Sequence, residues 1–344
     1  MQVGSIVNIP PDRRTYEGND FPLPHNKIGV EVEVERVRTG IREIEKLGTW
    51  RTTPEGSLRE HGVEFVFREP LFGKDAEQAI RDLMKTIGDI RERRFKDRNM
   101  DTLFRFSHRT SIHVHVDVRD MNPNDLFSFL YNYIIFERLM FRWIQEQSGI
   151  DRSESPFCVP YYCSPDEYTG VLSDLLDLER VYNKTIGDTD GDEIMAMEQV
   201  QNSIHHIFSR GPRYLAVNFS SLLNMGTLEF RQLHGTDNPD VILKWIHLIL
   251  HLKRHALENR EPPEYTLMRI SADPNAYLQQ VFGSLWEELE FPDTQWLLYS
   301  GVRKAQGTLL LKSIHRTSNS IRRTIDSASL LDNLNTRLKR NSSE

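Results

Sequence analysis

Acidic and imidazole side chains alternate with apolar residues in four short segments of the sequence, and one segment adds an arginine. These residues are Glu31, Glu33 and Glu35 in IGVEVEVERV, Glu64 in GVEFVF, His113, His115 and Asp117 in TSIHVHVDV, and Glu229 and Arg231 in GTLEFRQL. Oxygen-rich ligand sets of this kind bind Mg²⁺ or Mn²⁺ in preference to softer metals. The chemistry that these residues suggest is therefore chemistry at divalent cations.

The spacing of two indicates that each segment is a β-strand, because successive side chains of a strand point to opposite faces of the sheet. For any one strand, a solvated polar face is the simpler interpretation. Together the strands would place many carboxylates on one face, and like charges opposite each other destabilise a sheet by up to about 1 kcal/mol per pair. Bound cations would remove that repulsion. We therefore expect divalent cations to bind on this face of the sheet.

Helical segments interleave with these strands. Apolar residues recur at helical spacing in residues 76–95, and Asn-Pro pairs mark the starts of helices at residues 122–147 and 238–258. Residues 213–221 and 226–233 are predicted to be paired strands joined by a Leu-Asn-Met turn. Strands that are apolar on one face only favour an antiparallel sheet with helices packed on the other face, which is the α+β class.

The chain divides into three predicted parts. Residues 1–26 are rich in Pro, Asp and Asn and read as an irregular arm, and residues 27–260 hold all the strands described above. Residues 261–344 form a mostly helical extension, which ends in a Ser-, Asn- and Arg-rich tail with weak periodicity. We expect the middle part to be a catalytic domain.

Composition narrows the class of protein. The 344 residues carry a formal net charge of -7, and the mean hydropathy is -0.51. We expect a cytoplasmic protein without a membrane partner, because no apolar run approaches the roughly 18 residues that a membrane helix needs and the start of the chain has no signal pattern. The mildly negative net charge argues weakly against nucleic acid as the main partner but does not exclude it. The composition says nothing about the oligomeric state.

Four motifs occur in an order that resembles a known family. They are Glu-x-Glu at 31–33, Gly-Val-Glu-Phe at 62–65 after an acidic-Gly-Ser-Leu turn at 55–58, Ser-Ile-His-x-His at 111–115, and Leu-Glu-Phe-Arg at 228–231. Over residues 25–260 the chain resembles the carboxylate–amine ligases of the glutamine synthetase and glutamate–cysteine ligase fold, and most closely the branch called amidoligases. The resemblance implies a funnel-like site lined by an antiparallel sheet, as in the glutamine synthetase catalytic domain.

The resemblance also implies roles for individual residues. Metal ligands are implied at Glu31, Glu33, Glu64 and Glu229, and His113 would serve the metal and the nucleotide. His115 is one pleat further on the same face and could share the role of His113. Arg231 matches the arginine that contacts the transferred phosphate, so Arg231 and Glu64 are our candidate catalytic residues. Arg213 is a further candidate for binding a phosphate or a carboxylate.

The expected activity is ATP-dependent formation of an amide through an acyl phosphate, with ATP and Mg²⁺ or Mn²⁺ as cofactors. Phosphoryl transfer depends on positioning and charge neutralisation, which cations and an arginine on such a face can supply. The substrates would be a small-molecule or peptide carboxylate and an amine, and the Pro- and aromatic-rich residues 153–168 are our candidate for selecting the amine. Two alternatives stay open: a Mg²⁺-dependent hydrolase or nuclease, and an inactive binding module of the same fold.

Overall fold

The computed structural model describes residues 2–7, 26–37, 39–96, 104–163, 214–259 and 263–314, with the single residues 9, 23, 172, 198, 201 and 202. Arg213, most of the N-terminal arm, the helices expected near residues 165 and 192–208, and the tail after residue 314 lie outside the described residues. No helix in the described part of the chain is both long and apolar enough to cross a membrane.

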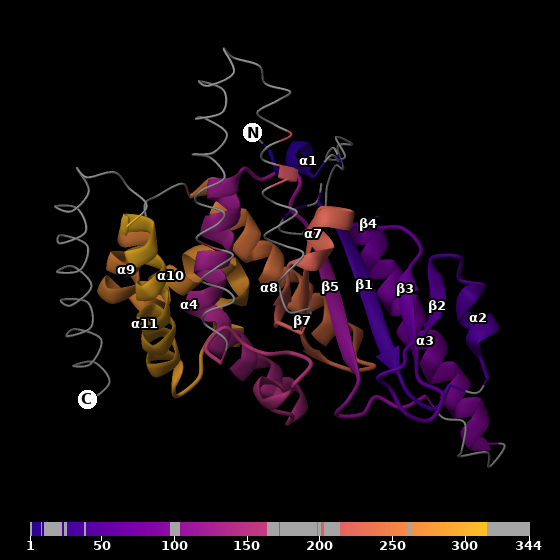
Figure 1. The fold of residues 1–344 in the computed structure, drawn as a ribbon. Helices are drawn as coiled ribbons and strands as arrows, with labels where there is room; N and C mark the ends of the chain where they lie inside the picture. The colour runs from indigo at the N-terminus through magenta and orange to yellow at the C-terminus, as the bar shows by residue number, and fades with distance from the viewer. Residues whose placement is uncertain are drawn as a thin grey trace.

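An antiparallel sheet forms the centre of the fold (Figure 1). Its strands are β1 (Lys27–Val34), β2 (Trp50–Pro54), β3 (Val63–Phe67), β4 (Leu71–Phe72), β5 (Ser111–Asp117), β6 (Val217–Asn218) and β7 (Thr227–His234). The order is β2-β3-β1-β5-β7-β6, with β4 paired to the start of β1. Every pairing between these strands is antiparallel, so the α+β class is confirmed.

The register of the sheet gathers the polar side chains on one face. Glu33 lies opposite Glu64 in the β1–β3 pairing, Glu31 opposite His113 in the β1–β5 pairing, and Glu229 opposite His115 in the β5–β7 pairing. The intervening valines, isoleucines, leucines and phenylalanines are buried on the other face. Because the alternation continues across four neighbouring strands, polar residues that are far apart in the sequence become neighbours.

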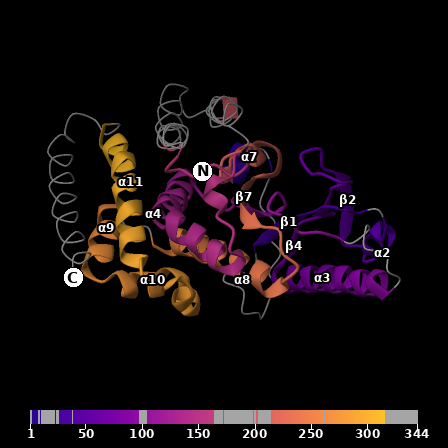
Figure 2. The ribbon, with the colours of Figure 1, turned by 90° about the horizontal axis from the view of Figure 1, so that it is seen from below.

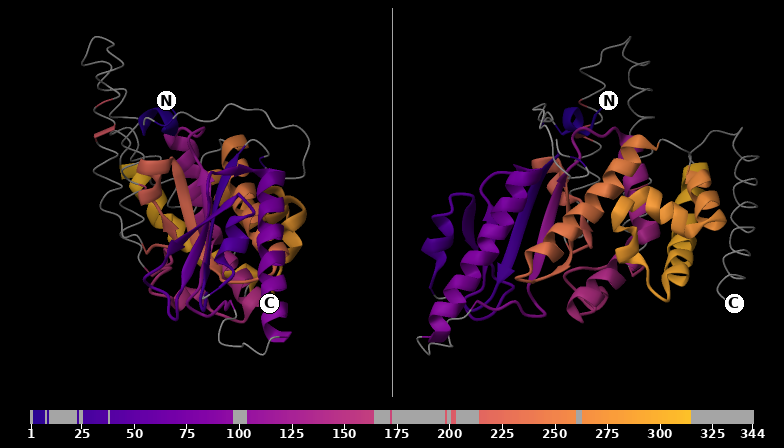
Figure 3. Two further views of the ribbon diagram at one scale, coloured as in Figure 1. Left: turned by 90° about the vertical axis from the view of Figure 1, so that its right-hand side faces the viewer. Right: turned by 180° about the vertical axis from the view of Figure 1, so that it is seen from behind.

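Three helices cover the apolar face of the sheet. They are α3 (Gly73–Lys96), α4 (Pro123–Ser148) and α8 (Pro239–Glu258), and α3 and α8 run along the same side of the strands (Figures 2 and 3). The predicted N-caps are present: Asn122 accepts hydrogen bonds from the backbone N–H groups of Asn124 and Asp125, and Asn238 accepts one from Asp240. These caps fix where two of the three helices begin.

Further helices complete the described chain. They are α1 (Val3–Ile6), α2 (Ile41–Glu45), η2 (Arg152–Glu154), α7 (Ser220–Met225), α9 (Pro263–Ala272), α10 (Pro274–Phe282), η3 (Gly283–Leu289) and α11 (Thr294–Ile314). Helix α1 is a single turn within the arm that was expected to be irregular. Helices α9, α10 and α11 gather at the end of the molecule away from β2, and α11 packs along α4 (Figure 1).

Two local predictions were wrong. The predicted strand 213–221 is a two-residue strand, β6, and the chain then forms helix α7 where a Leu-Asn-Met turn was expected. Gly226 ends that helix with a φ of 68°, which suits glycine. Residues 52–57, TTPEGS, have the composition of a turn, but residues 52–54 belong to β2, which pairs with β3 and extends the sheet. Tertiary pairing outweighs the weak local signal in both segments.

Candidate active site

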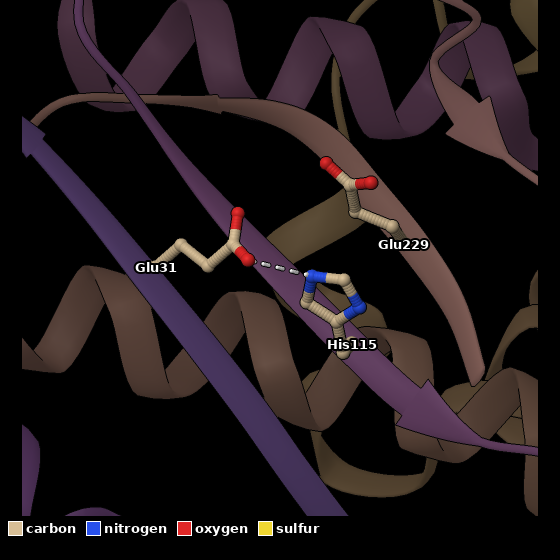
Figure 4. A group of neighbouring side chains, drawn as sticks. All are labelled: Glu31, His115 and Glu229. Atoms are coloured by element: carbon tan, nitrogen blue, oxygen red, sulfur yellow. Dashed lines mark hydrogen bonds and ion pairs between the residues drawn. The ribbon is translucent and has the colours of Figure 1, made fainter. Parts of the chain in front are cut away.

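Two groups of side chains on the polar face could each hold a divalent cation. One group is Glu31, Glu64 and His113, and the other is Glu31, His115 and Glu229. Within each group one possible ligand atom per residue lies within 4.8 Å of the others. Glu31 belongs to both groups, so its carboxylate could bridge two cations. Figure 4 shows the second group, whose members come from β1, β5 and β7.

His113 is the buried centre of the cluster, since only 3% of its side chain is exposed. Its Nδ1 lies 3.1 Å from an oxygen of Glu31, 3.4 Å from Glu229 and 3.8 Å from Glu64. The Nε2 atom of His115 lies 3.1 Å from the other oxygen of Glu31. The two imidazoles therefore take one carboxylate oxygen each, and they fix the orientation of Glu31.

The surroundings shift the pKa values of two carboxyl groups in opposite directions. Burial opposes ionisation of Glu31, but hydrogen bonds with His113 and His115 outweigh it and lower the pKa of Glu31. Burial, together with the charges of Glu31, Glu33 and Glu55, raises the pKa of Glu64 to about 9. The cluster thus holds more acidic groups than it can ionise without an added positive charge, which is what a cation would supply.

Glu33 differs from the other expected ligands. Its Oε2 accepts hydrogen bonds from the backbone N–H of Ser111 at 2.7 Å and from the Ser111 hydroxyl at 2.6 Å. Among the described residues it belongs to neither cation group. Its metal-binding role stays a prediction, and the geometry shows Glu33 anchoring the start of β5 beside His113.

Glu229 and Arg231 form the edge of the cluster on β7. Glu229 accepts a hydrogen bond from the Asn218 amide at 2.6 Å and forms an ion pair with Arg231. Burial opposes the charge of Arg231, but Glu229 outweighs it and raises the pKa of the guanidinium. A bulge in the β5–β7 pairing lies at this point and leaves Arg231 on the same face as Glu229.

A pocket of about 360 Å³ opens over this face, and we call it the first pocket. Its lining combines the acidic cluster with residues from loops: Glu31, Glu33, Glu55, Ser57, Glu64, Arg109, Ser111, His113, Phe157, Tyr214, Asn218, Ser220, Glu229 and Arg231. The rings of Phe157 and Tyr214 meet edge to face, with centroids 5.6 Å apart. The first pocket therefore offers carboxylates and two arginines within it and an aromatic pair in its wall.

A second pocket, also of about 360 Å³, lies at the other side of Glu31. Four basic side chains, Lys27, Arg51, Arg68 and Arg119, contribute to its lining. Its apolar lining includes Val30, Val66, Phe67, Pro70 and Met225. Glu31 and His115 also line the second pocket and belong to the two groups that could hold cations, which together we call the cation cluster. Such a pocket suits a ligand with a flat apolar part and a strongly anionic part.

A protein-family profile described as "Putative amidoligase enzyme" matches residues 76–253, which is more than half of the chain. The chain belongs to this amidoligase family. No curated protein and no solved structure matched the sequence. The amidoligase match includes β5 and β7, and so His113, Glu229 and Arg231, whereas Glu31 and Glu64 precede it along the chain.

The amidoligase structure brings most of the expected site residues together. Glu31, Glu33, Glu64, His113, Glu229 and Arg231 line the first pocket, and His115 lines the second. Arg213 lies outside the described residues, so its role stays a prediction. The roles of the others as ligands or catalysts also stay predictions.

Several lining residues were not identified from the sequence. Ser111 has the same strand parity as His113, so the alternation of β5 could have indicated it. Arg109 comes from a loop, in which no period shows the direction of a side chain, whereas Phe157 lies within residues 153–168, which composition alone had indicated. Arg51 lies in β2, a strand that the sequence pattern did not predict.

Proposed function

We propose that this amidoligase is an ATP-dependent carboxylate–amine ligase, which forms an amide through an acyl-phosphate intermediate. The observation that carries the proposal is that the cation cluster lies between the second pocket, which is basic, and the first pocket, which is acidic, with Arg231 beside Glu229. A ligase of this kind must bring phosphate, carboxylate and amine together at one point. We also propose that the sheet has the architecture of the glutamine synthetase catalytic domain.

The donor groups fit Mg²⁺ or Mn²⁺. Each group provides carboxylate oxygens and one imidazole, and burial together with the neighbouring carboxylates raises the pKa of Glu64. Glu31, Glu64 and His113 would hold one cation, and Glu31, His115 and Glu229 would hold another. When bound, these cations would offset the charge of the phosphates.

We assign the second pocket to the nucleotide. Its basic side chains suit the phosphates and its apolar wall suits a flat base. His115 and Glu31, which belong to the cation cluster, also line this pocket. The acceptor and donor substrates then occupy the first pocket. Arg109 is a candidate anchor for an anionic part of the donor, because it lines the first pocket and its guanidinium is held in place by a hydrogen bond to the Ser57 carbonyl oxygen at 2.7 Å.

In the first step a substrate carboxylate oxygen attacks the γ-phosphorus of ATP. A new O–P bond forms, the bond from the γ-phosphorus to the β–γ bridging oxygen breaks, and ADP leaves. Arg231 would bind the oxygens of the transferring group, whose contacts with a planar guanidinium strengthen in the transition state. Its ion pair with Glu229 orients the guanidinium before the substrates bind.

In the second step the amine nitrogen attacks the acyl carbon. A C–N bond forms, the C–O bond to phosphate breaks, and inorganic phosphate leaves. The incoming ammonium must also lose protons, and Glu55 is available to accept one because it lines the first pocket and belongs to neither cation group. Its carboxylate is oriented by the backbone N–H of Ser57 at 2.9 Å.

The proposal is tested by incubating the purified protein with Mg-ATP and pooled carboxylates and amines. The expected products are ADP, phosphate and an adduct that has lost one water, identified by mass spectrometry. AMP as the nucleotide product would contradict the acyl-phosphate route. Cleavage of phosphodiesters without any nucleotide requirement would support a hydrolase instead.

Nucleotide placement is tested separately by thermal unfolding. Mg-ATP should raise the melting temperature when Mg²⁺ or ATP alone does not, since a ligand at 100 times its Kd stabilises a fold by about 2.7 kcal/mol. Arg51→Ala and Arg68→Ala should reduce that shift. Arg303→Ala on α11 is the matched control and should keep it. An unchanged shift in both pocket variants would overturn the assignment of the second pocket.

A further inference from the structure

A buried carboxylate outside the cation cluster connects helix α4 to the wall of the first pocket. Glu137 on α4 is 1% exposed and is not a pocket-lining residue. Its Oε1 accepts hydrogen bonds from the Tyr133 hydroxyl at 2.7 Å and from the backbone N–H of Tyr161 at 2.8 Å. Its Oε2 accepts one from the backbone N–H of Tyr162 at 3.3 Å. A carboxylate is rarely buried without such partners.

The residues that Glu137 holds belong to residues 151–163, which we call the pocket loop. The next residue of α4 holds the same loop, because the guanidinium of Arg138 lies 4.3 Å from the ring centroid of Tyr162. Tyr161 and Tyr162 of the pocket loop therefore contact two successive residues of α4. Nearer its start it carries Phe157, whose ring lines the first pocket.

The pocket loop also pairs with the edge of the sheet. The backbone N–H of Val159 donates to the Tyr214 carbonyl oxygen at 2.8 Å, and the Ala216 N–H donates to the Val159 carbonyl oxygen at 2.8 Å. The Arg231 N–H in turn donates to the Ala216 carbonyl oxygen at 3.0 Å. A continuous ladder thus runs from the pocket loop to Arg231 on β7.

Side-chain hydrogen bonds also connect the pocket loop to β7. The Nε of Arg231 donates to the carbonyl oxygen of Phe157 at 3.4 Å. From the apolar side of the sheet, the Gln232 amide donates to the Tyr133 hydroxyl at 2.7 Å, and that hydroxyl donates to Glu137. Gln232 is fully buried and lies at the bulge of β7. One tyrosine hydroxyl therefore ties the bulge beside Arg231 to the anchor of the pocket loop.

We infer that Glu137 and Tyr133 are positioning residues for the first pocket. They hold the pocket loop against β7 and thereby fix the Arg231 guanidinium and the Phe157 ring. Neither touches a substrate. The inference rests on the proposed function, because it gives Arg231 a role in phosphoryl transfer and Phe157 a role in contacting a substrate.

Glu137→Gln is the most direct test, because it keeps the volume of the side chain. The glutamine can accept from Tyr161 through its one oxygen, but its NH₂ then faces the N–H of Tyr162, and two donors oppose each other. We expect amide hydrogen exchange at residues 161–163 to accelerate at least tenfold. We expect the rate of ADP formation from Mg-ATP to fall about tenfold, with the KM for Mg-ATP changed by less than twofold.

Tyr133→Phe and Tyr277→Phe form a matched pair. Both remove a buried hydroxyl that contacts α4, but the Tyr277 hydroxyl bonds Asn132 at 3.2 Å and His255 at 3.1 Å, on the side of the helical extension. Tyr133→Phe should accelerate exchange in the pocket loop and lower turnover. Tyr277→Phe should lower the melting temperature by a similar amount with full turnover.

The outcomes separate the two proposals. Unchanged exchange in the pocket loop of both Glu137→Gln and Tyr133→Phe would overturn the inference, as would faster exchange with full turnover. An equal loss of turnover in Tyr277→Phe would show that Glu137 and Tyr133 have only a general structural role, and this result would also overturn the inference. Absence of ATP turnover in the unmodified protein would overturn the proposed function, and hydrogen exchange would still decide whether Glu137 and Tyr133 hold the loop.

Discussion

Arg231 lies on the polar face of β7, where it forms an ion pair with Glu229 and donates to the Phe157 carbonyl oxygen at 3.4 Å. Arg231→Lys keeps the charge but loses the planar two-point geometry. We expect turnover to fall by roughly tenfold to a thousandfold, the order seen when one preorganised donor is lost. Mg-ATP affinity should stay within several-fold. ADP release and nucleotide binding of this variant are the measurements, and near-full turnover would show that Arg231 only neutralises its neighbours.

Glu31 and Glu64 should respond oppositely to the same substitution in metal-free protein. The lowered pKa of Glu31 means that its charge adds stability above the ordinary carboxyl range, whereas the pKa of Glu64, raised to about 9, means that the contribution of Glu64 is lost as the pH rises from about 4.5 to 9. At pH 7, Glu31→Gln should lower the free energy of unfolding by about 1–3 kcal/mol. Glu64→Gln should raise the free energy of unfolding at pH 7, because Glu64 must take up a proton when the protein folds, and the gain should be larger at pH 9.5.

Urea unfolding in the presence of a chelator checks both variants. Each should also lose Mg²⁺-dependent activity, because each removes a candidate cation ligand. Equal destabilisation of Glu31→Gln and Glu64→Gln at pH 7 would contradict the opposite environments of the two carboxyl groups.

The approach of β1 to β5 depends on a glycine. Gly29 lies opposite His115, and a Cβ at Gly29 would lie 3.0 Å from the His115 Cβ. Gly29→Ala should displace the imidazole and weaken Mn²⁺ binding at least several-fold, measured by calorimetry, without unfolding the sheet. Gly88→Ala on α3 is the control, since a Cβ there meets no atom within 4 Å. Equal Mn²⁺ affinity in both variants would show that His115 is not a ligand.

The contribution of the buried Glu137 to stability should depend on pH. Burial raises the pKa of Glu137 to about 7, although Tyr133, the backbone N–H groups of Tyr161 and Tyr162, and the charge of Arg138 act in the opposite direction. A raised carboxyl pKa gives stability that is complete below about pH 4.5 and is lost as the pH rises through 7. The buried Cys158 thiol, whose pKa burial raises to about 11, stays neutral throughout this range.

Comparison with Glu137→Gln isolates this contribution. Between pH 5 and 7 the free energy of unfolding of the unmodified protein should fall relative to the variant, by at most about 1.4 kcal/mol per pH unit. Urea unfolding at several pH values measures the difference. Parallel pH profiles would show that Glu137 ionises in the folded protein as easily as in water.

At the scale of the whole molecule, the helical extension packs against the catalytic part of the chain through α4. Helix α11 crosses α4 so closely that a Cβ at Gly301 would lie 1.9 Å from the Ile135 carbonyl oxygen. Gly301→Ala should therefore force the helices apart and cost about 1–3 kcal/mol, as overpacking of a core does. Calorimetry should show a lower melting temperature, with Gly88→Ala as the control. An unchanged melting temperature would mean that the crossing is loose. The division of the chain at residue 260 stays a prediction.

The sequence by itself determined which side chains share a face. A period of two does not depend on neighbours, so Glu31, Glu64, His113 and Glu229 could be assigned to one surface, and Asn-Pro pairs located the starts of α4 and α8 by local hydrogen bonding. Family motifs lie on these same strands. Local rules were sufficient wherever a residue's direction follows from its own segment.

Tertiary structure alone decided which of these residues meet. The order β3-β1-β5-β7 makes Glu31 common to both cation groups, and Ser111 donates two hydrogen bonds to Glu33, which belongs to neither group among the described residues. Arg109 and Phe157 reach the first pocket from loops, and Glu137 acts from the opposite side of the sheet. These are contacts between segments distant in the chain, and their geometry depends on strand order, a bulge and helix packing. No local periodicity encodes them.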